Sequence, residues 1–194
     1  IGQLVRASQV VRGTLRVEGD ALVIHVRAVA LDSATVLADV TERGTLAELF
    51  TTLERIARHI APASSRTSAD VERLHPPVAA FESYIKGLLA ETPSTAVGYL
   101  NAALKADPTL DRARIALWEI FDDQGEHTRA LAVATAVRDS SPLVRRARFR
   151  AALSQMHLKR YDDALATMKA LNDARSTPGL LNNMGVVQLR RSGT

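Results

Sequence analysis

The side chains that could do acid–base or metal chemistry are spread along the whole chain. The five histidines are His25, His59, His75, His127 and His157, and none of them forms an HExxH pair or lies beside a cysteine, because the chain has no cysteine. Two carboxylate pairs, Asp122-Asp123 and Asp162-Asp163, are candidates for a metal site or for acid–base catalysis. Both pairs lie at predicted turns, where solvated carboxylates are favoured by the helix dipole. We interpret them as turn and helix-start residues and predict no metal site.

Nucleophile and phosphate-binding patterns are also missing. Ser64-Ser65 and Ser140-Ser141 have no neighbouring histidine and no nucleophile-elbow glycines, which argues against a serine hydrolase. The ten glycines form no phosphate-cradling loop, so the sequence does not support a nucleotide site. We therefore predict no enzymatic activity and no cofactor.

One arginine-rich run, Arg145-Arg146-Ala147-Arg148-Phe149-Arg150, could hold phosphate or stack on a base. On a helix, however, these side chains spread over more than half of the circumference and form no single patch. A solvated face that pairs with Asp or Glu of a neighbouring repeat is the favoured interpretation, so no nucleic-acid partner is predicted. Trp118 is likewise expected to pack in the core.

Composition limits the function classes further. The chain has 194 residues, 46% of them hydrophobic, 24% charged and 4% aromatic, which excludes disordered, collagen-like and disulfide-scaffold proteins. No apolar run reaches the roughly 18 to 20 residues of a membrane span. The formal charge of +4 is too small to argue for nucleic acid. We expect a soluble chain, with the cytoplasm slightly favoured over the periplasm.

The first part of the chain reads with the period of two that is typical of strands. Three antiparallel strands are predicted, over Gln9–Val17, Ala21–Leu31 and Thr35–Glu42. Gly19 provides the hairpin turn, Asp32-Ser33-Ala34 the second turn, and Gly44 is expected to end the last strand. One face of the second strand carries Leu22, Ile24, Val26, Ala28 and Ala30.

A change of period at Thr45 predicts an amphipathic helix that lies across the sheet. Its apolar stripe consists of Leu46, Leu49, Phe50, Leu53, Ile56, Ala57 and Ile60. Thr45 and Glu48 have capping-box spacing. A linker is predicted over 63–77, with the boundary near residue 70, and the pattern from Val78 onward is entirely helical.

The helical part repeats itself every 34 residues. Ala96, Ala130 and Ala164 are spaced by this period, and so are Pro108 and Pro142. Further stripe residues follow each alanine after four positions (Leu100, Ala134, Met168) and after seven (Ala103, Val137, Leu171). Those offsets place each alanine and the two residues that follow it on one face of the same helix.

This pattern resembles the tetratricopeptide repeat over residues 78–194. Ala130 and Ala164 match the small residue of the family's second helix, and Phe121 matches the aromatic residue late in its first helix. Gly125 matches the turn between the two helices, and Pro108 and Pro142 match the proline that ends the repeat. Asp162-Asp163-Ala164-Leu165, after Lys159-Arg160-Tyr161, also follows the pattern, whereas Trp118 and Ala152 replace the usual glycine. Leu181–Gly185 begins another first helix and Ser192-Gly193 resembles its turn, so we expect about three and a half repeats and a longer parent protein.

Residues 1–62 resemble the end of the TolB-like amino-terminal domain. The resemblance runs through Val10–Leu15, Leu22–Arg27, Leu31-Asp32, Val36–Ala38 and a helix that begins near Leu46. In bacterial proteins this domain often precedes tetratricopeptide repeats, with a kinase, nucleotide cyclase or winged-helix effector upstream. The resemblance implies a partial α/β domain with one sheet edge or face uncovered.

The fold class is therefore predicted to be α+β followed by all-α, with three strands and a helix before a superhelix of helical hairpins. In the tetratricopeptide family, the first helices line a concave groove. The positions that the resemblance implies for partner binding are Arg112, Ile115, Glu119, Asp122, Arg146, Phe149, Leu153 and Met156. Phe149, Leu153 and Met156 form an apolar stripe that either receives a peptide or helix or belongs to the core.

Three functional hypotheses follow. The first is a scaffold that binds a partner protein or peptide in the groove; the lysine and asparagine clamp for a C-terminal carboxylate is absent from these positions. The second is a regulatory or sensory region of a larger bacterial signalling protein. The third is self-association, through the sheet or the last helix. A resemblance in fold carries little weight between them.

Overall fold

The computed structural model describes residues 7–61 and 75–193 of the chain. These residues belong to two compact units, Ile1–Val78 and Ala79–Thr194. The predicted linker over 63–77 falls almost wholly outside the described residues. Within the described ranges, no helix is long and apolar enough to cross a membrane.

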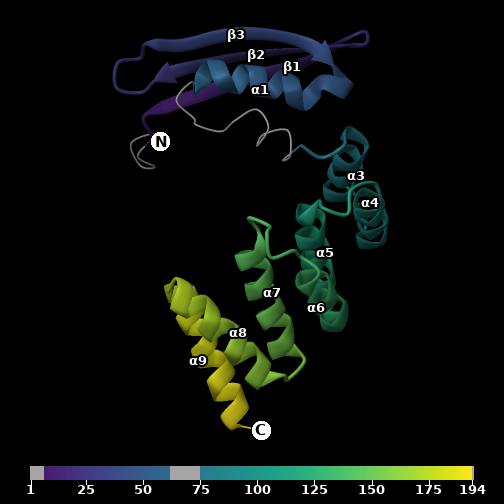
Figure 1. Ribbon diagram of the computed structural model, residues 1–194, viewed down its shortest axis with the longest axis vertical. Coiled ribbons are helices and arrows are strands. Elements are labelled where there is room, and N and C mark those ends of the chain that lie inside the picture. The colour runs from purple at the N-terminus through teal and green to yellow at the C-terminus, as the bar shows by residue number, and fades with distance from the viewer. Residues whose placement is uncertain (1–6, 62–74, 194) are drawn as a thin grey trace. The chain divides into compact units, whose positions relative to one another are not determined.

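A three-stranded antiparallel sheet forms the first unit, with α1 along one face (Figure 1). The strands are β1 (Gln9–Glu18), β2 (Ala21–Ala30) and β3 (Val36–Thr45), in the spatial order β1-β2-β3. Gly19 turns the β1–β2 hairpin with φ of +64°, a conformation that costs glycine nothing because it has no Cβ. The predicted hairpin and the alternation of β2 are confirmed.

The third strand is longer than predicted. Gly44 does not end β3 but pairs with Leu22 inside it. A Cβ on Gly44 would collide with the Thr52 hydroxyl oxygen, so glycine lets the following helix approach the strand closely. This glycine is therefore a packing residue and not a strand terminator.

Helix α1 (Leu49–Ile60) follows a short 3-10 turn, Leu46–Glu48. The carboxylate of Glu48 accepts hydrogen bonds from the backbone N–H of Thr45 at 2.9 Å and from its hydroxyl at 3.2 Å, and these bonds lower the pKa of Glu48. The first of these bonds is the reach-back half of the predicted capping box.

The apolar stripe of α1 is rotated from the predicted one. Ile56 packs with Leu22, Ile24 and Val26 of β2. Leu46 and Leu53, which were expected in the stripe, are 57% and 42% exposed.

The second unit is built of helices that pack in sequence, each against the next from α4 to α9. They are α3 (Val78–Leu88), α4 (Pro93–Ala106), α5 (Asp111–Asp123), α6 (His127–Thr135), α7 (Val144–His157), α8 (Tyr161–Ala174) and α9 (Pro178–Ser192). In Figure 1 they run from teal to yellow. A sheet followed by helices confirms the predicted order of fold classes.

The 34-residue period is a property of the packing as well as of the sequence. Helices α4, α6 and α8 begin at residues 93, 127 and 161. All nine stripe positions are buried: Ala96, Leu100, Ala103, Ala130, Ala134, Val137, Ala164, Met168 and Leu171. The first stripe position of each helix is alanine (Ala96, Ala130 and Ala164), because neighbouring helices approach closely there.

The turns between paired helices repeat too. Gly125 and Lys159, one period apart, precede α6 and α8 and have φ of +72° and +61°. A left-handed residue at this point ends the preceding helix, and glycine is the usual choice. The expectation of a turn at Gly125 is confirmed, and Lys159 adopts the same conformation without the advantage of glycine.

Candidate functional site

Three adjoining hollows follow one surface of the helical unit, and we call them together the groove. The first hollow, of about 330 Å³, lies among α3, α4 and α5. The middle hollow, of about 270 Å³, lies among α3, α5 and α7 and is lined by Tyr84, Leu88, Arg112, Ile115, Ala116, Glu119, Leu143 and Arg146. Glu119 lines both hollows, so the two are continuous along α5.

The last hollow is the largest, at about 450 Å³, and it is mostly apolar. It is lined by Pro142, Arg145, Arg146, Phe149, Leu171, Thr177, Gly179 and Leu180. Arg146 belongs to the middle and the last hollow, which joins α5 to α7 and α9 along one surface. The groove therefore follows the first helix of each successive pair.

The charged residues of the groove are separated by sign. Glu91, Glu119 and Asp123 line the first hollow, which has no basic lining residue. Arg145 and Arg146 line the last hollow, which has no acidic lining residue. The described residues thus place an acidic end at α3 and α4 and a basic end at α7 and α9.

Ion pairs across neighbouring helices organise the centre of the groove. The carboxylate of Glu119 on α5 accepts from Arg146 at 3.3 Å and from Arg150 at 2.5 Å, both on α7. The guanidinium of Arg150 also lies over the ring of Trp118, 4.3 Å from its centroid. Two arginines of the run therefore pair with a carboxylate of the neighbouring helix pair, as predicted.

Arg145 has a different role from the other arginines of the run. Its guanidinium donates to the backbone carbonyls of Leu171 at 2.8 Å and of Arg175 at 2.5 Å. The Leu171 carbonyl also accepts from the backbone N–H of Arg175 at 3.1 Å, and Arg175 directly follows α8. The side chain is thereby fixed at the edge of the last hollow, and it has no carboxylate partner among the described residues.

The structure places the eight predicted partner-binding residues in three environments. Arg112, Glu119 and Arg146 are exposed, and Phe149 is half-buried in the wall of the last hollow. Asp122 lies beside His127 at the end of α5, with 3.1 Å between the carboxylate oxygen and Nδ1. The other three side chains lie in or against the core.

These three apolar side chains contribute to the core, and Ile115 also lines the middle hollow. Ile115 packs with Val137 and Ala147, Met156 belongs to the core of α7, α8 and α9, and Leu153 packs against it. Ile115 and Met156 are only 5% and 7% exposed. Of the predicted stripe, Phe149 alone lines a hollow, because the stripe turns inward along α7 and meets α8.

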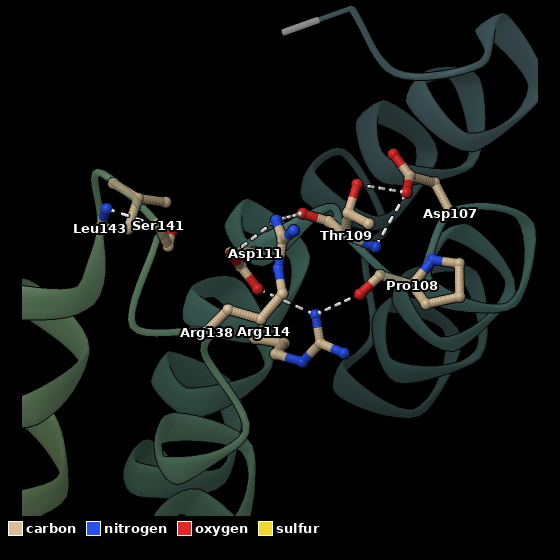
Figure 2. Close-up of polar contacts among 8 residues, drawn as sticks. All are labelled: Asp107, Pro108, Thr109, Asp111, Arg114, Arg138, Ser141 and Leu143. Atoms are coloured by element: carbon tan, nitrogen blue, oxygen red, sulfur yellow. Dashed lines mark hydrogen bonds and ion pairs between the residues drawn. The ribbon is translucent and has the colours of Figure 1, made fainter. Parts of the chain in front are cut away.

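A buried carboxylate that sequence reasoning missed lies at the start of α5. Asp111 is 4% exposed and forms ion pairs with Arg114 at 3.0 Å and with Arg138 at 3.2 Å (Figure 2). The same arginines donate to the carbonyls of Pro108 and Thr109. The cluster ties the loop before α5 to Arg138, in the segment between α6 and α7. All its charges are paired, so we assign it a structural role.

The histidine with a shifted pKa lies where α6 meets α7. The rings of His127 and His157 stack with centroids 4.2 Å apart. Burial, and then the neighbouring His127 and Arg190, lower the pKa of His157, while Asp122 acts in the opposite direction. In the described residues no group of three or more His, Asp or Glu could hold a metal ion.

The remaining candidates for chemistry are separated from one another. Ser64 and Ser65 lie outside the described residues. The Ser141 hydroxyl accepts from the backbone N–H of Leu143 at 3.2 Å (Figure 2). Asp162 and Asp163 lie in the first turn of α8, where Asp162 pairs with Arg191. The interpretation of the second Asp pair as helix-start residues is confirmed.

No protein-family model matches the chain, and no curated protein matches it.

Proposed function

We propose that residues 78–194 form a tetratricopeptide-type scaffold, without catalytic activity, that binds an extended segment of a partner protein in the groove. The observation that carries the proposal is the continuity of the three hollows along α3, α5, α7 and α9. The first and middle hollows share Glu119, and the middle and last hollows share Arg146. An isolated pocket would suit a small molecule, whereas a run of open hollows along several helices suits a chain.

The repeat type is supported by three independent features of the helices. The 34-residue period appears in the helix starts, in the nine buried stripe positions and in the left-handed turn residues Gly125 and Lys159. In a stack of this kind, each unit contacts its neighbours, and the surface is formed before the ligand arrives. Binding to a preformed surface loses little protein conformational entropy.

The groove also selects a class of ligand. Phe149, Leu171 and Leu180 offer the last hollow an apolar wall, with Arg145 and Arg146 at its edge. This hollow suits an apolar side chain with a carboxylate beside it. The acidic first hollow suits a basic residue further along the same peptide. The proposed ligand is therefore a peptide with a basic residue toward one end and an apolar-acidic pair toward the other.

The test is a selection from a display library of random peptides on the purified chain. Peptides that bind should be enriched in an apolar residue beside Asp or Glu, and each is then measured for Kd against variants. Phe149→Asp and Arg146→Glu should each weaken binding about tenfold or more, because each changes the wall of the last hollow. Arg148→Glu is the matched control, since Arg148 lies on the same helix but lines none of the three hollows.

Retained folding of each variant is checked by circular dichroism. Binding that survives both Phe149→Asp and Arg146→Glu, or that Arg148→Glu weakens equally, would contradict the groove as the site. Arg146→Glu keeps the test decisive if Phe149→Asp unfolds, because the Arg146 side chain is exposed.

A further inference from the structure

The first unit carries an open sheet edge. Strand β1 pairs with β2 along its whole length, and in the described part of the chain no strand pairs with its other side. All ten residues of β1 are exposed. An edge strand of this length presents unpaired backbone N–H and C=O groups, which are a template for a further strand.

The same strand carries apolar side chains that the core does not cover. The register with β2 places Val11, Leu15 and Val17 beside Ala28, Ile24 and Leu22, on the face where α1 packs. The β1 residues are 48%, 55% and 72% exposed, whereas their β2 neighbours are buried. The apolar row of the sheet therefore continues past the reach of its helix.

Helix α1 is held away from β1 by its polar contacts. Arg55 donates to the Glu42 carboxylate at 2.9 Å and to the carbonyl of Arg43 at 3.1 Å, both on β3. These bonds anchor the helix over β3. Leu53, one of the apolar side chains of α1, is 42% exposed.

We propose that β1 pairs in an antiparallel arrangement with β1 of a second copy of this chain, across a twofold axis at Leu15. A twofold axis normal to the sheet keeps both helices on one face. It also places opposite each other only residues whose side chains point to the same face of the sheet. Registers centred on Arg12, Thr14 or Arg16 place arginine opposite arginine. Those centred on Val11 or Gly13 leave each charged residue opposite an uncharged one.

Charge complementarity selects the Leu15 register among those that pair at least half of β1. In it, Arg12 of each copy lies opposite Glu18 of the other. Among the described residues Arg12 forms no ion pair, and Glu18 has a long contact of 3.7 Å with Arg43. Two cross-strand ion pairs therefore become available at the dimer interface.

Side-chain size agrees with the same register. Leu15 meets Leu15 on the twofold axis, on the face that α1 occupies. Val17, the most exposed of the apolar β1 residues, lies opposite Gly13, which has no side chain to compete for the space. The pairing would join two three-stranded sheets into one of six strands and bring the exposed apolar rows of the two copies into contact at the twofold axis.

Sedimentation equilibrium of the whole chain, from micromolar to near-millimolar concentration, tests the proposal. The chain should be in monomer–dimer equilibrium. Arg12→Glu should raise the dimer Kd about tenfold or more, because it places like charges opposite each other twice. The exchange Arg12→Glu with Glu18→Arg should bring Kd back to within about threefold of the original value, since it restores both pairs.

Arg16→Glu is the matched control, because Arg16 lies opposite Thr14 in this register and its replacement should leave the dimer no weaker. Circular dichroism confirms that each variant keeps its fold. A chain that is monomeric throughout the range would overturn the proposal, and would assign the edge to another segment or another protein. A dimer that Arg12→Glu leaves intact, or that the charge exchange does not restore, would overturn it equally.

Discussion

The indole N–H of Trp118 on α5 donates a hydrogen bond of 2.9 Å to the hydroxyl of Ser154 on α7. The two residues are 36 positions apart in sequence, and both are buried. This bond satisfies the single polar atom of the Trp118 side chain, which is the usual requirement for a buried tryptophan. It also joins two successive helix pairs through their cores.

Replacement of the acceptor should therefore weaken the helical unit. Ser154→Ala leaves the Trp118 N–H buried without a partner, so we expect a loss of about 1 to 2 kcal/mol in the free energy of unfolding. Urea titration followed by circular dichroism measures this loss. In a Trp118→Phe background the same substitution should cost much less, and equal losses in both backgrounds would show that the bond contributes nothing.

Asp111 should be the most sensitive carboxylate of the helical unit. Asp111→Asn keeps the size of the side chain but removes the charge that neutralises Arg114 and Arg138, and we expect a loss of about 2 to 3 kcal/mol. Asp123→Asn, at an exposed position on the same helix, should change stability by less than about 0.5 kcal/mol. The measurement is urea unfolding monitored by the fluorescence of Trp118, the single tryptophan. Similar losses in the two variants would refute the structural role of Asp111.

Two glycines in neighbouring helices should respond to alanine in opposite directions. A Cβ on Gly87 in α3 would lie 2.8 Å from Cγ of the fully buried Leu100 and 3.4 Å from the carbonyl oxygen of Ala96, so α4 would have to shift. Gly87→Ala should therefore destabilise by about 1 to 3 kcal/mol, despite the better helix propensity of alanine. Gly98 in α4 has no atom within 4 Å of its added Cβ, so Gly98→Ala should stabilise by about 0.5 to 1 kcal/mol. Thermal unfolding of both variants decides the signs, and a stabilising Gly87→Ala would disprove the close contact.

Acid should weaken the helical unit through His157. Burial lowers the pKa of His157 in the folded state below its ordinary value of 6.5, so the unfolded state binds the proton more readily. Neutral His157 makes its full contribution to the free energy of unfolding above pH 6.5. This contribution is lost as the pH falls from 6.5 through the pKa of His157 in the folded state. The Tm from Trp118 fluorescence should therefore fall between neutral and mildly acidic pH, and His157→Gln should reduce that slope. His59→Gln, on α1 in the other unit, is the control, and a slope unchanged in His157→Gln would exclude this histidine as the cause.

The repeating part of the fold could be predicted because its signals are local. A helical stripe depends on spacing along one helix, so Ala96, Ala130 and Ala164 could be recognised as core positions without knowledge of their neighbours. The β1–β2 hairpin was equally predictable, because Gly19 and the alternation of β2 are local signals. The assignment of these helices to the tetratricopeptide family and the identity of the partner stay predictions.

Which apolar positions stay at the surface depends on contacts between helices that are distant in sequence. Phe149, Leu153 and Met156 share one stripe in sequence, yet Phe149 alone lines a hollow, because α8 and α9 cover the end of α7. The side of α1 that meets the sheet was also undetermined, since Gly44 and the Arg55 contacts on β3 set the rotation of the helix. The burial of Asp111 depends on Arg138, 27 residues away, and a pairing over that distance leaves no local signal. Periodicity reports the face that a helix buries, but the depth of burial depends on how neighbouring elements approach, and that is decided only when the whole chain has packed.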